Sequence, residues 1–417
     1  MRILMVSEDV PYENMGGLAK HALNLSASLI ACGHDVDFLG GDQFPISVAG
    51  DDGNFGGRFF GELRGHRAGW KESKLGFFNP YKRTWIAKKF ASVIAKRAVG
   101  YDVVHYHGHV PNLALYLPKS LPFIQTRHDQ GSDCLTHTRF RNGEICTSID
   151  SADCASCIAR LPNKWQQALS TIAVKRYRAE VAASFLARPP VFVSAMLKEN
   201  FARSSGVGPI GIVVHNFTSP DLLGTANCGP LRSPDAALTE VIVVGKLYPP
   251  KGIDRFIELF AKCNPKDCSL LILGDGPQLE TLRSKFASER IRFLGWCTNS
   301  VALRYTAGAD VVVVPSIWEE PCATTILEGL GLGKTTFALN RGGTPELSIY
   351  ERRPGQLKLF DDLEGMVANL NRYVPFDPLS DLVGEYKASV QNAVTRLIPI
   401  YDSVRANEDG RCNVAQD

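Results

Sequence analysis

Short apolar runs alternate with amphipathic patterns along most of the chain. The apolar runs predict strands at 3–7, 36–40, 103–107, 123–126, 191–194 and 212–215, and then at 241–245, 270–274, 291–294, 311–315 and 336–339. A helical period predicts helices at 19–31, 82–98, 254–262, 278–287 and 325–331. Continuous apolar strands that alternate with helices are typical of parallel sheets covered on both faces. We therefore predict an α/β protein.

A change in composition divides this pattern into two halves. The segment between Ser219 and Thr239 is rich in proline and glycine, which is typical of a linker. We predict two Rossmann-like domains, 1–218 and 219–383, whose parallel sheets face a central cleft. The last helical stretch, 384–405, should return to the first domain, and the polar tail after it should be frayed.

Size and charge exclude several classes of protein. The chain has 417 residues and a net charge of +3, which is too small to indicate nucleic-acid binding. No apolar run approaches the roughly 20 residues that span a bilayer. The strand-like start also lacks the pattern of a signal peptide. We therefore expect a soluble, cytoplasmic protein.

A dense group of polar residues follows the predicted strand at 311–315. Glu319 and Glu320 lie in the loop, and Glu328 lies in the opening turns of the next helix, which Thr324 or Thr325 could cap. Doubly wound sheets bind ligands at the carboxyl ends of their strands. A helix N-terminus at that edge offers N–H groups to a phosphate, and carboxylates can accept hydrogen bonds from sugar hydroxyls.

Several short motifs occur in order along the chain. They are Gly16-Gly17 before a helix, Asp102–His107, Gly245-Lys246-Leu247 with Lys251-Gly252, Gly274–Pro277, Phe293–Gly295, Glu320–Ala323 with Glu328, and Gly342–Glu346. This series resembles the retaining glycosyltransferases of family 4, which have the GT-B fold. The resemblance covers nearly the whole chain and is densest after Thr239.

This resemblance implies the transfer of a sugar from a nucleotide-diphosphate donor to an acceptor hydroxyl, with retention and without a catalytic metal. It assigns Lys246 and Lys251 to the donor phosphates, Glu320 and His107 to the donor sugar, and Glu328 to the ribose. The family usually has arginine in place of Lys246, and lysine lacks the bidentate fork. The alternatives for these residues are solvated lysines, a solvated helix carboxylate and a core histidine.

Other residues complete the donor site that the resemblance implies. Gly16 and Gly17 should permit positive φ and a close backbone approach, although a plain turn is the alternative. Ala323 and Cys322 replace the family's usual glycine and phenylalanine, which bears on the choice of donor. The expected donor contacts are Gly16, Gly17, Gly245, Gly274, Trp296, Cys297, Ala323, Thr324 and Thr325.

Three histidines near the ends of the predicted strands have different expected roles. His107 should face the cleft, and we expect His105 to point to the opposite face of the sheet. His128, with Asp129 beside it, would line the acceptor side.

The sequence leaves the substrates and some alternatives open. The donor could be a UDP-, GDP-, ADP- or dTDP-sugar, and the acceptor a polysaccharide, a lipid-linked sugar or a small natural product. The alternative functions are an epimerase or phosphorylase on the GT-B scaffold, or a non-catalytic partner of a transferase. A non-catalytic partner would bind no nucleotide.

Four of the eleven cysteines cluster in a polar, loop-like stretch at 129–160. Cys134, Cys146, Cys154 and Cys157 could hold a structural zinc ion in tetrahedral geometry. A subset of the family carries a similar pattern. Free thiols and disulfides are the alternatives.

Three further patterns carry less weight. The segment 82–98 is a basic amphipathic helix that would either contact the inner face of an anionic membrane or pack on the sheet. The segment 331–336 resembles a phosphate-binding P-loop, but Glu328 stands where that motif needs glycine. Asp35-Val36-Asp37 matches a metal-binding string by chance.

Overall fold

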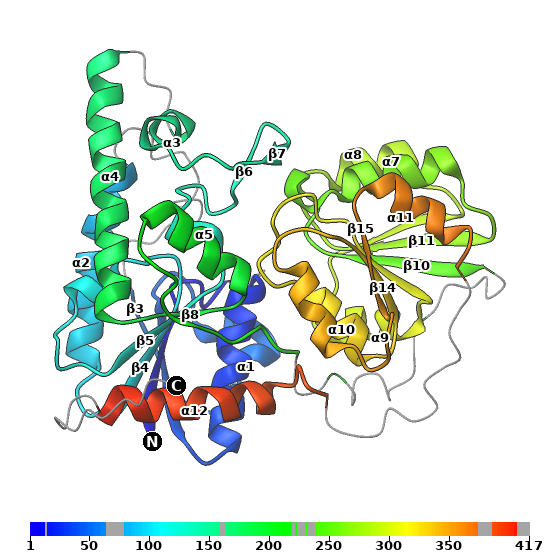
Figure 1. Cartoon of the computed structure of the whole chain (residues 1–417). Helices are drawn as coiled ribbons and strands as arrows, with labels where there is room; N and C mark the ends of the chain where they lie inside the picture. Colours follow the sequence, from blue (N-terminus) through cyan, green and yellow to red (C-terminus); the bar gives the residue numbers. More distant parts are fainter. Residues whose placement is uncertain are drawn as a thin grey trace. The chain divides into compact units, whose positions relative to one another are not determined.

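The computed structural model describes residues 1–12, 15–63, 79–158, 163–218, 222, 231, 238–373 and 386–406. The chain forms two compact units (Figure 1). Unit 1 contains Met1–Arg139, Thr147–His215 and Val390–Asp417, and unit 2 contains Phe140–Cys146 and Asn216–Ser389. The division falls after His215, where we expected 218, and it places Phe140–Cys146, expected in the first domain, in unit 2.

Unit 1 is built on a seven-stranded sheet with the order β3-β2-β1-β4-β5-β8-β9. Every pairing within it is parallel. Its strands are β1 (Arg2–Val6), β2 (Asp35–Gly41), β3 (Phe59–Leu63), β4 (Val103–His107), β5 (Phe123–Arg127), β8 (Val191–Phe192) and β9 (Ile212–Val213). The strand order reverses between β1 and β4, so the loops after these two strands flank the edge at which such sheets bind ligands.

Six α-helices accompany this sheet within the described residues. They are α1 (Gly17–Ala31), α2 (Asn79–Arg97), α3 (Ser151–Ile158), α4 (Lys164–Ala187), α5 (Ala195–Ser205) and α12 (Val390–Ala406). Short 3-10 helices are η1 (Ile46–Gly53), η3 (Leu113–Tyr116) and η4 (Gln130–Ser132). The last helix, α12, packs on α1, and its Tyr401 hydroxyl lies 2.7 Å from Nδ1 of His105.

Helix α2 packs on the sheet, which is one of the two alternatives that its sequence left open. Ile86, Phe90 and Ile94 are buried in the core beneath the helix. Trp85, in contrast, is 61% exposed. Most of the apolar face therefore packs on unit 1, and Trp85 projects from it.

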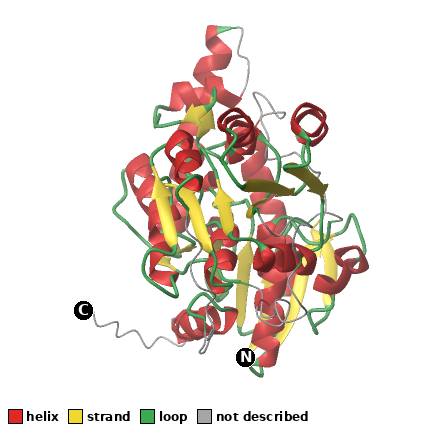
Figure 2. Cartoon of the chain, turned by 90° about the vertical axis from the view of Figure 1, so that its right-hand side faces the viewer, coloured by secondary structure: helices red, strands yellow, loops and turns green. Residues whose placement is uncertain are grey.

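Unit 2 contains a six-stranded parallel sheet with the order β12-β11-β10-β13-β14-β15. The strands are β10 (Thr239–Val244), β11 (Cys268–Leu273), β12 (Ile291–Gly295), β13 (Val311–Val314), β14 (Thr335–Leu339) and β15 (Leu357–Phe360). The helices are α7 (Ile253–Cys263), α8 (Leu279–Phe286), α9 (Asn299–Gly308), α10 (Thr324–Gly331) and α11 (Leu363–Leu370), with 3-10 helices η5 (Pro249–Lys251) and η6 (Thr344–Tyr350). Helices lie alongside the strands (Figure 2), and the strand order reverses between β10 and β13.

These two parallel sheets confirm the predicted α/β class. Elements that the sequence did not predict are β3, β15, α3, α4, α5, α9, α11 and an antiparallel hairpin of β6 (Phe140–Arg141) and β7 (Glu144–Ile145). The hairpin and α3 lie in the stretch expected to be a loop. The expected linker after Ser219, the break near Pro375 and the tail beyond residue 406 lie mostly or wholly outside the described residues. None of the described helices is long and apolar enough to cross a bilayer.

The expectation for His105 is wrong. Side chains in a strand alternate with a period of two, so His105 and His107 point to the same face of the sheet. Their ring centroids lie 4.0 Å apart. Nε2 of His105 lies 2.8 Å from Thr126 Oγ1, and Nδ1 contacts Tyr401, so both ring nitrogens of His105 have partners in the core.

The remaining sequence patterns have structural explanations. Asp37 accepts hydrogen bonds from Arg58 and Tyr101, and Asp35 pairs with Arg2. This agrees with a chance match to the metal-binding string. Residues 331–336 join the end of α10 to β14, whereas a P-loop would precede a helix.

Candidate functional site

The reversal of strand order in unit 2 brings two loops together. After β10 the chain runs through Lys246 into η5, which ends at Lys251. After β13 it runs through Glu320 into α10. Since β10 and β13 are neighbours, these loops meet, and Lys251 Nζ lies 2.9 Å from Oε1 and 2.7 Å from Oε2 of Glu320. The sequence predicted both residues for one site, and they are in direct contact.

The Glu320 carboxylate is almost fully engaged. It is 7% exposed, and Oε2 also accepts hydrogen bonds from Ser316 Oγ at 2.9 Å and Trp318 Nε1 at 2.8 Å. Burial would raise the pKa of Glu320, but Lys251 and these donors hold it below its usual value. Burial would likewise lower the pKa of Lys251, and the Glu320 carboxylate raises it above its usual value. Both partners are therefore charged near neutral pH.

Two glycines in this part of unit 2 are required by the packing of the backbone. A Cβ on Gly274, which has φ of +143°, would lie 1.8 Å from the carbonyl oxygen of Gly245. A Cβ on Gly342, which has φ of +59°, would lie 2.6 Å from the amide nitrogen of Glu320. Gly343 N also donates to Glu320 O at 2.8 Å. The Gly342-Gly343 loop therefore fixes the backbone that carries Glu320.

The N-terminus of α10 lacks the predicted threonine cap. The helix begins at Thr324, and the N-cap residue is Ala323, so the expectation that Thr324 or Thr325 caps it is wrong. Ala323, the N-cap residue, makes no side-chain hydrogen bond to these first N–H groups. Uncapped N–H groups at a helix start are suited to an anion. Just before the cap, Cys322 is buried, and burial raises the pKa of its thiol to about 12.

The other predicted donor contacts lie at the same edge of the sheet. Lys246 is exposed, and its Nζ lies 6.0 Å from the centroid of the Tyr248 ring. Glu328 is partly buried in the second turn of α10, and Trp296 and Cys297 follow β12. The contacts of the described residues do not test the roles of these four, which stay predictions.

The glycine turn before α1 differs from its expected geometry. Gly16 is the N-cap of α1 and has φ of −75°, so the positive φ expected there is wrong. A Cβ on Gly16 or Gly17 would meet no heavy atom of the described chain within 4 Å. The packing of the described residues therefore does not require glycine here, and the predicted approach of a ligand remains a separate reason for it.

In unit 1, His107 belongs to a cluster of imidazoles. His107 is fully buried at the end of β4, and its Nδ1 lies 2.9 Å from Nε2 of His128, just after β5. His21 from α1 completes the group, which we call the histidine cluster (His21, His107 and His128). Burial lowers the pKa of His107 well below its usual value, and His105, His128 and His21 add to this effect. Neutral rings are therefore favoured.

The sequence analysis noted only Asp129 of a buried polar network next to this cluster and missed its other members. His109 lies between two carboxylates, with Nε2 2.7 Å from Asp9 and Nδ1 2.5 Å from Asp129, and Asp129 also lies 3.0 Å from Nδ1 of His137. Burial would raise the pKa of Asp129, but His137 and His109 hold it well below its usual value. Glu8 accepts from the amide of His109 at 2.6 Å. Glu8, Asp9, His109 and Asp129 all follow strand ends, and this shared position was the signal available in the sequence.

The four clustered cysteines stay a predicted zinc site. None of the four forms a disulfide bond. Across the described residues, the two groups of side chains close enough to share a metal ion consist of histidines and one aspartate, and neither contains a cysteine. Cys154 Sγ instead lies 3.1 Å from a guanidinium nitrogen of Arg178.

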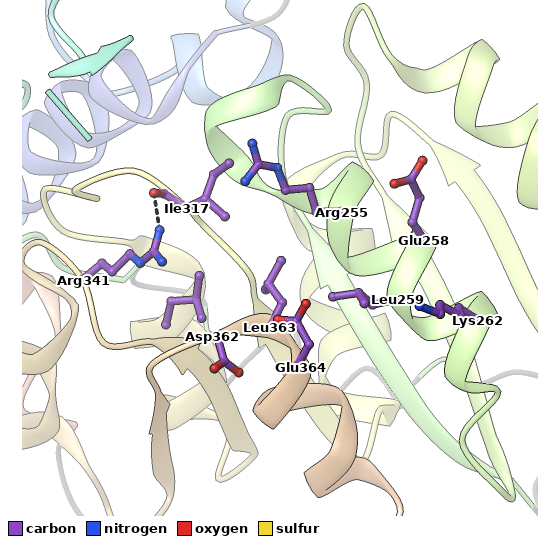
Figure 3. A pocket seen from close by; sticks show the side chains of 10 residues that line it. Arg255, Glu258, Leu259, Lys262, Ile317, Arg341, Asp362, Leu363 and Glu364 are labelled. Atoms are coloured by element: carbon purple, nitrogen blue, oxygen red, sulfur yellow. Dashed lines mark hydrogen bonds between the residues drawn. The ribbon is translucent and has the colours of Figure 1, made fainter. Parts of the chain in front are cut away.

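A pocket of about 420 Å³ in unit 2 is lined by residues other than Lys251 and Glu320 (Figure 3). Helices α7 and α11 contribute to its wall, and Arg341 donates to the carbonyl oxygen of Ile317 at 2.8 Å. Its charged lining residues are three basic (Arg255, Lys262 and Arg341) and three acidic (Glu258, Asp362 and Glu364). This balance indicates no particular ligand.

Family comparisons agree with this arrangement of two sheets. The family model described as Glycosyltransferase Family 4 matches residues 15–221, and the model described as Glycosyl transferases group 1 matches residues 239–374. The chain belongs to the GT-B glycosyltransferases. This glycosyltransferase therefore matches its family over both halves of the chain.

Individual relatives have low sequence identity to this chain, and the similarity can extend over most of its length. Glycogen synthase of Mycobacterium tuberculosis H37Rv is 24% identical over 387 residues, which cover 84% of this chain and 80% of the relative. A lipopolysaccharide core biosynthesis glycosyltransferase of Rhizobium meliloti, LpsD, is 29% identical over 164 residues, 38% of this chain and 46% of the relative.

Solved structures share the fold of this glycosyltransferase at low identity. A glycosyltransferase from Rickettsia africae has a TM-score of 0.61 at 16% identity, over 97% of this chain and 99% of that one. Anabaena HepE, solved in complex with UDP-glucose, has a TM-score of 0.56 at 16% identity, over 99% and 100% of the two chains.

Proposed function

We propose that this glycosyltransferase moves a sugar, with retention of the anomeric configuration, from a nucleotide-diphosphate donor to an acceptor hydroxyl. In this proposal residues 219–383 hold the donor, and residues 1–218 with the helix at 384–405 hold the acceptor. The observation that carries it is the contact between Lys251 and Glu320 at the strand reversal of unit 2, with Nζ 2.7 Å from Oε2. This contact supports the proposal, because one molecule with a phosphate and a sugar could bind both a cation and a carboxylate.

The proposed chemistry needs positive charge at the leaving group. The bond between the anomeric carbon and the β-phosphate oxygen breaks, and negative charge develops on the diphosphate. Lys251, Lys246 and the uncapped N–H groups of α10 would stabilise that charge. Glu320 would bind hydroxyls of the donor sugar, and Glu328 those of the ribose.

Retention would follow from attack on the face that the diphosphate leaves. The acceptor oxygen bonds to the anomeric carbon, and its proton passes to the departing phosphate oxygen. No side chain acts as a nucleophile, and no step needs a metal ion. His107 would contact the donor sugar and help to stabilise its developing positive charge.

A UDP-hexose is the first donor to test. HepE, which shares the fold, was solved with UDP, with UDP and glucose, and with UDP-glucose. GDP-, ADP- and dTDP-sugars are the other candidates. Relatives that make glycogen and the lipopolysaccharide core favour an acceptor in polysaccharide or glycolipid synthesis.

The test is a donor screen with the purified full chain. Each sugar nucleotide is incubated with and without glycan or lipid-linked acceptors, and mass spectrometry follows product formation and slow donor hydrolysis. Proton NMR of the product then reports the anomeric configuration. We expect E320Q to lose transfer while E319Q, altered at the neighbouring carboxylate, keeps it.

Three outcomes would contradict the proposal. Binding of no nucleotide would favour a non-catalytic partner. Conversion of the sugar nucleotide without transfer would favour an epimerase, and a product with inverted configuration would exclude the proposed front-face attack.

We also propose that unit 1 contacts an anionic membrane surface. Helices α2 and α4 pack together, and the Tyr81 hydroxyl lies 3.5 Å from the carbonyl oxygen of Leu169. Trp85 on α2 is 61% exposed, and Trp165 and Ile172 on α4 are 58% and 60% exposed. The sequence of α2 contains six basic residues and no acidic residue. Exposed tryptophans beside basic side chains are suited to an anionic lipid interface.

Vesicle sedimentation tests this membrane proposal. We expect the full chain to bind phosphatidylcholine vesicles that contain phosphatidylglycerol, and to bind less at high salt because screening weakens the attraction. W85A/W165A should lose binding, and I349A, at an exposed apolar residue of unit 2, should retain it. Equal binding by the two variants would contradict the proposal.

A further inference from the structure

The histidine cluster brings together three imidazoles from distant parts of unit 1. His21 comes from α1, His107 ends β4, and His128 follows β5. One ligand atom from each lies within 4.8 Å of the other two. His21 and His107 are buried and His128 is partly exposed, so the group has one side through which an ion could enter.

The spacing of the rings agrees with coordination of one ion. Their centroids are separated by 5.3 Å for His21 and His107, 4.6 Å for His21 and His128, and 5.2 Å for His107 and His128. Three imidazoles bound to zinc at about 2.0–2.1 Å in tetrahedral geometry place their ring centroids roughly 5 Å apart. A bound ion would separate Nδ1 of His107 and Nε2 of His128, now 2.9 Å apart, by only a few tenths of an ångström.

The contact between His107 and His128 joins two imidazole nitrogens. Nδ1 of His107 lies 2.9 Å from Nε2 of His128. An ion bound at this point would take both nitrogens as ligands.

The second group of possible ligands does not need an ion. In the group of His109, Asp129 and His137, the carboxylate contacts both rings, and Asp9 contacts the far nitrogen of His109. These hydrogen bonds account for the arrangement of that network. The case for a metal therefore rests on the histidine cluster.

We propose that His21, His107 and His128 together bind one transition-metal ion of the zinc class. Three nitrogen ligands and no carboxylate favour zinc, cobalt, nickel or copper over magnesium, calcium or manganese. Three protein ligands leave a fourth position for water or for an oxygen of a bound molecule. The ion would tie α1 to the ends of β4 and β5, and it would take as a ligand the ring of His107, which the proposed function assigns to the donor sugar.

Zinc titration of the chelator-stripped full chain tests this site. C154S/C157S is the background, so that the predicted cysteine site does not contribute. We expect one equivalent of zinc to bind and to raise the melting temperature, because an ion that binds only the folded state stabilises it. Cobalt bound at the same site should show d–d absorption without a sulfur-to-cobalt charge-transfer band.

Single substitutions locate the ion. H128Q, at the partly exposed ligand, should weaken zinc binding by at least about tenfold. H34Q, at a histidine of unit 1 outside both groups, should bind as the background does, and circular dichroism checks that each variant is folded. Absence of zinc binding, or binding that survives H128Q and H21Q, would overturn the proposal. Loss of binding in D129N with retention in H128Q would place the ion in the second group and would also overturn it.

Discussion

Replacement of Lys251 by alanine should weaken the binding of a nucleoside diphosphate. A charge-assisted hydrogen bond contributes about 1.5–3 kcal/mol, which corresponds to about 10- to 150-fold in Kd. In the structure, however, Lys251 already bonds both carboxylate oxygens of Glu320. A diphosphate must compete with that carboxylate, so we expect a loss near the lower end of this range.

The same competition predicts that replacement of Glu320 has the opposite effect on nucleotide binding. E320Q removes a negative charge 2.7 Å from Lys251 Nζ and leaves an amide oxygen that can still accept from Ser316 or Trp318. UDP without a sugar should therefore bind E320Q more tightly, by about 1 kcal/mol or fivefold, since this is the upper range for a partly exposed ion pair. Sugar transfer should fall, because the same carboxylate is proposed to hold the donor sugar.

Isothermal titration of wild type, K251A and E320Q with UDP separates these effects. K266A and E319Q are the matched controls, because Lys266 is an exposed lysine of the same unit and Glu319 is adjacent to Glu320. Unchanged affinity in K251A would remove Lys251 from the donor site. Weaker UDP binding in E320Q, equal to that in K251A, would refute the idea that the carboxylate competes with the diphosphate for Lys251.

Two further predictions concern the stability of unit 2. G274A should lower the free energy of unfolding by about 3 kcal/mol or more, because the new Cβ would lie 1.8 Å from a carbonyl oxygen at φ of +143°. G16A, whose Cβ would meet no described atom within 4 Å, should melt like wild type. Equal melting temperatures for the two variants would contradict this prediction. The Lys251–Glu320 pair should also make stability depend on acid. Because the folded pKa of Glu320 is below its unfolded value of 4.5, the contribution is complete above about pH 4.5 and is lost as the pH falls through the folded pKa. Urea unfolding at a series of pH values gives the free energy of unfolding as a function of pH. This free energy should fall less steeply in acid for E320Q than for wild type, and an identical fall would exclude a role for this carboxylate.

Much of the fold could be predicted because buried parallel strands are continuous apolar runs. Val311–Val314 and Cys268–Leu273 are of this kind, and their predicted positions are right to within two residues. Strand β15 (Leu357–Phe360) was missed because a lysine interrupts its apolar sequence at the edge of the sheet. Helix α4 was missed because its polar and apolar residues are mixed around the helix and several apolar side chains are exposed.

The site was predictable only for residues that belong to a recognisable motif. Lys251 and Glu320 each belong to a recognisable motif, and the position of each after a strand brings them together. The cap of α10 was not predictable, because a threonine at the first helical position looks the same in sequence as one at the cap. His21, His107 and His128 lie in three separate segments, and only the order of the strands shows that they meet.

The bond between Tyr401 and His105 also bears on how the chain folds as it leaves the ribosome. These partners are 296 positions apart, and all of unit 2 is translated between them. At about 5–20 residues per second, β4 would wait roughly 15–60 s for the helix that covers it. Every strand of unit 2 would be translated before α12 reaches unit 1, and the uncovered surface of unit 1 would be open to chaperones until translation ends.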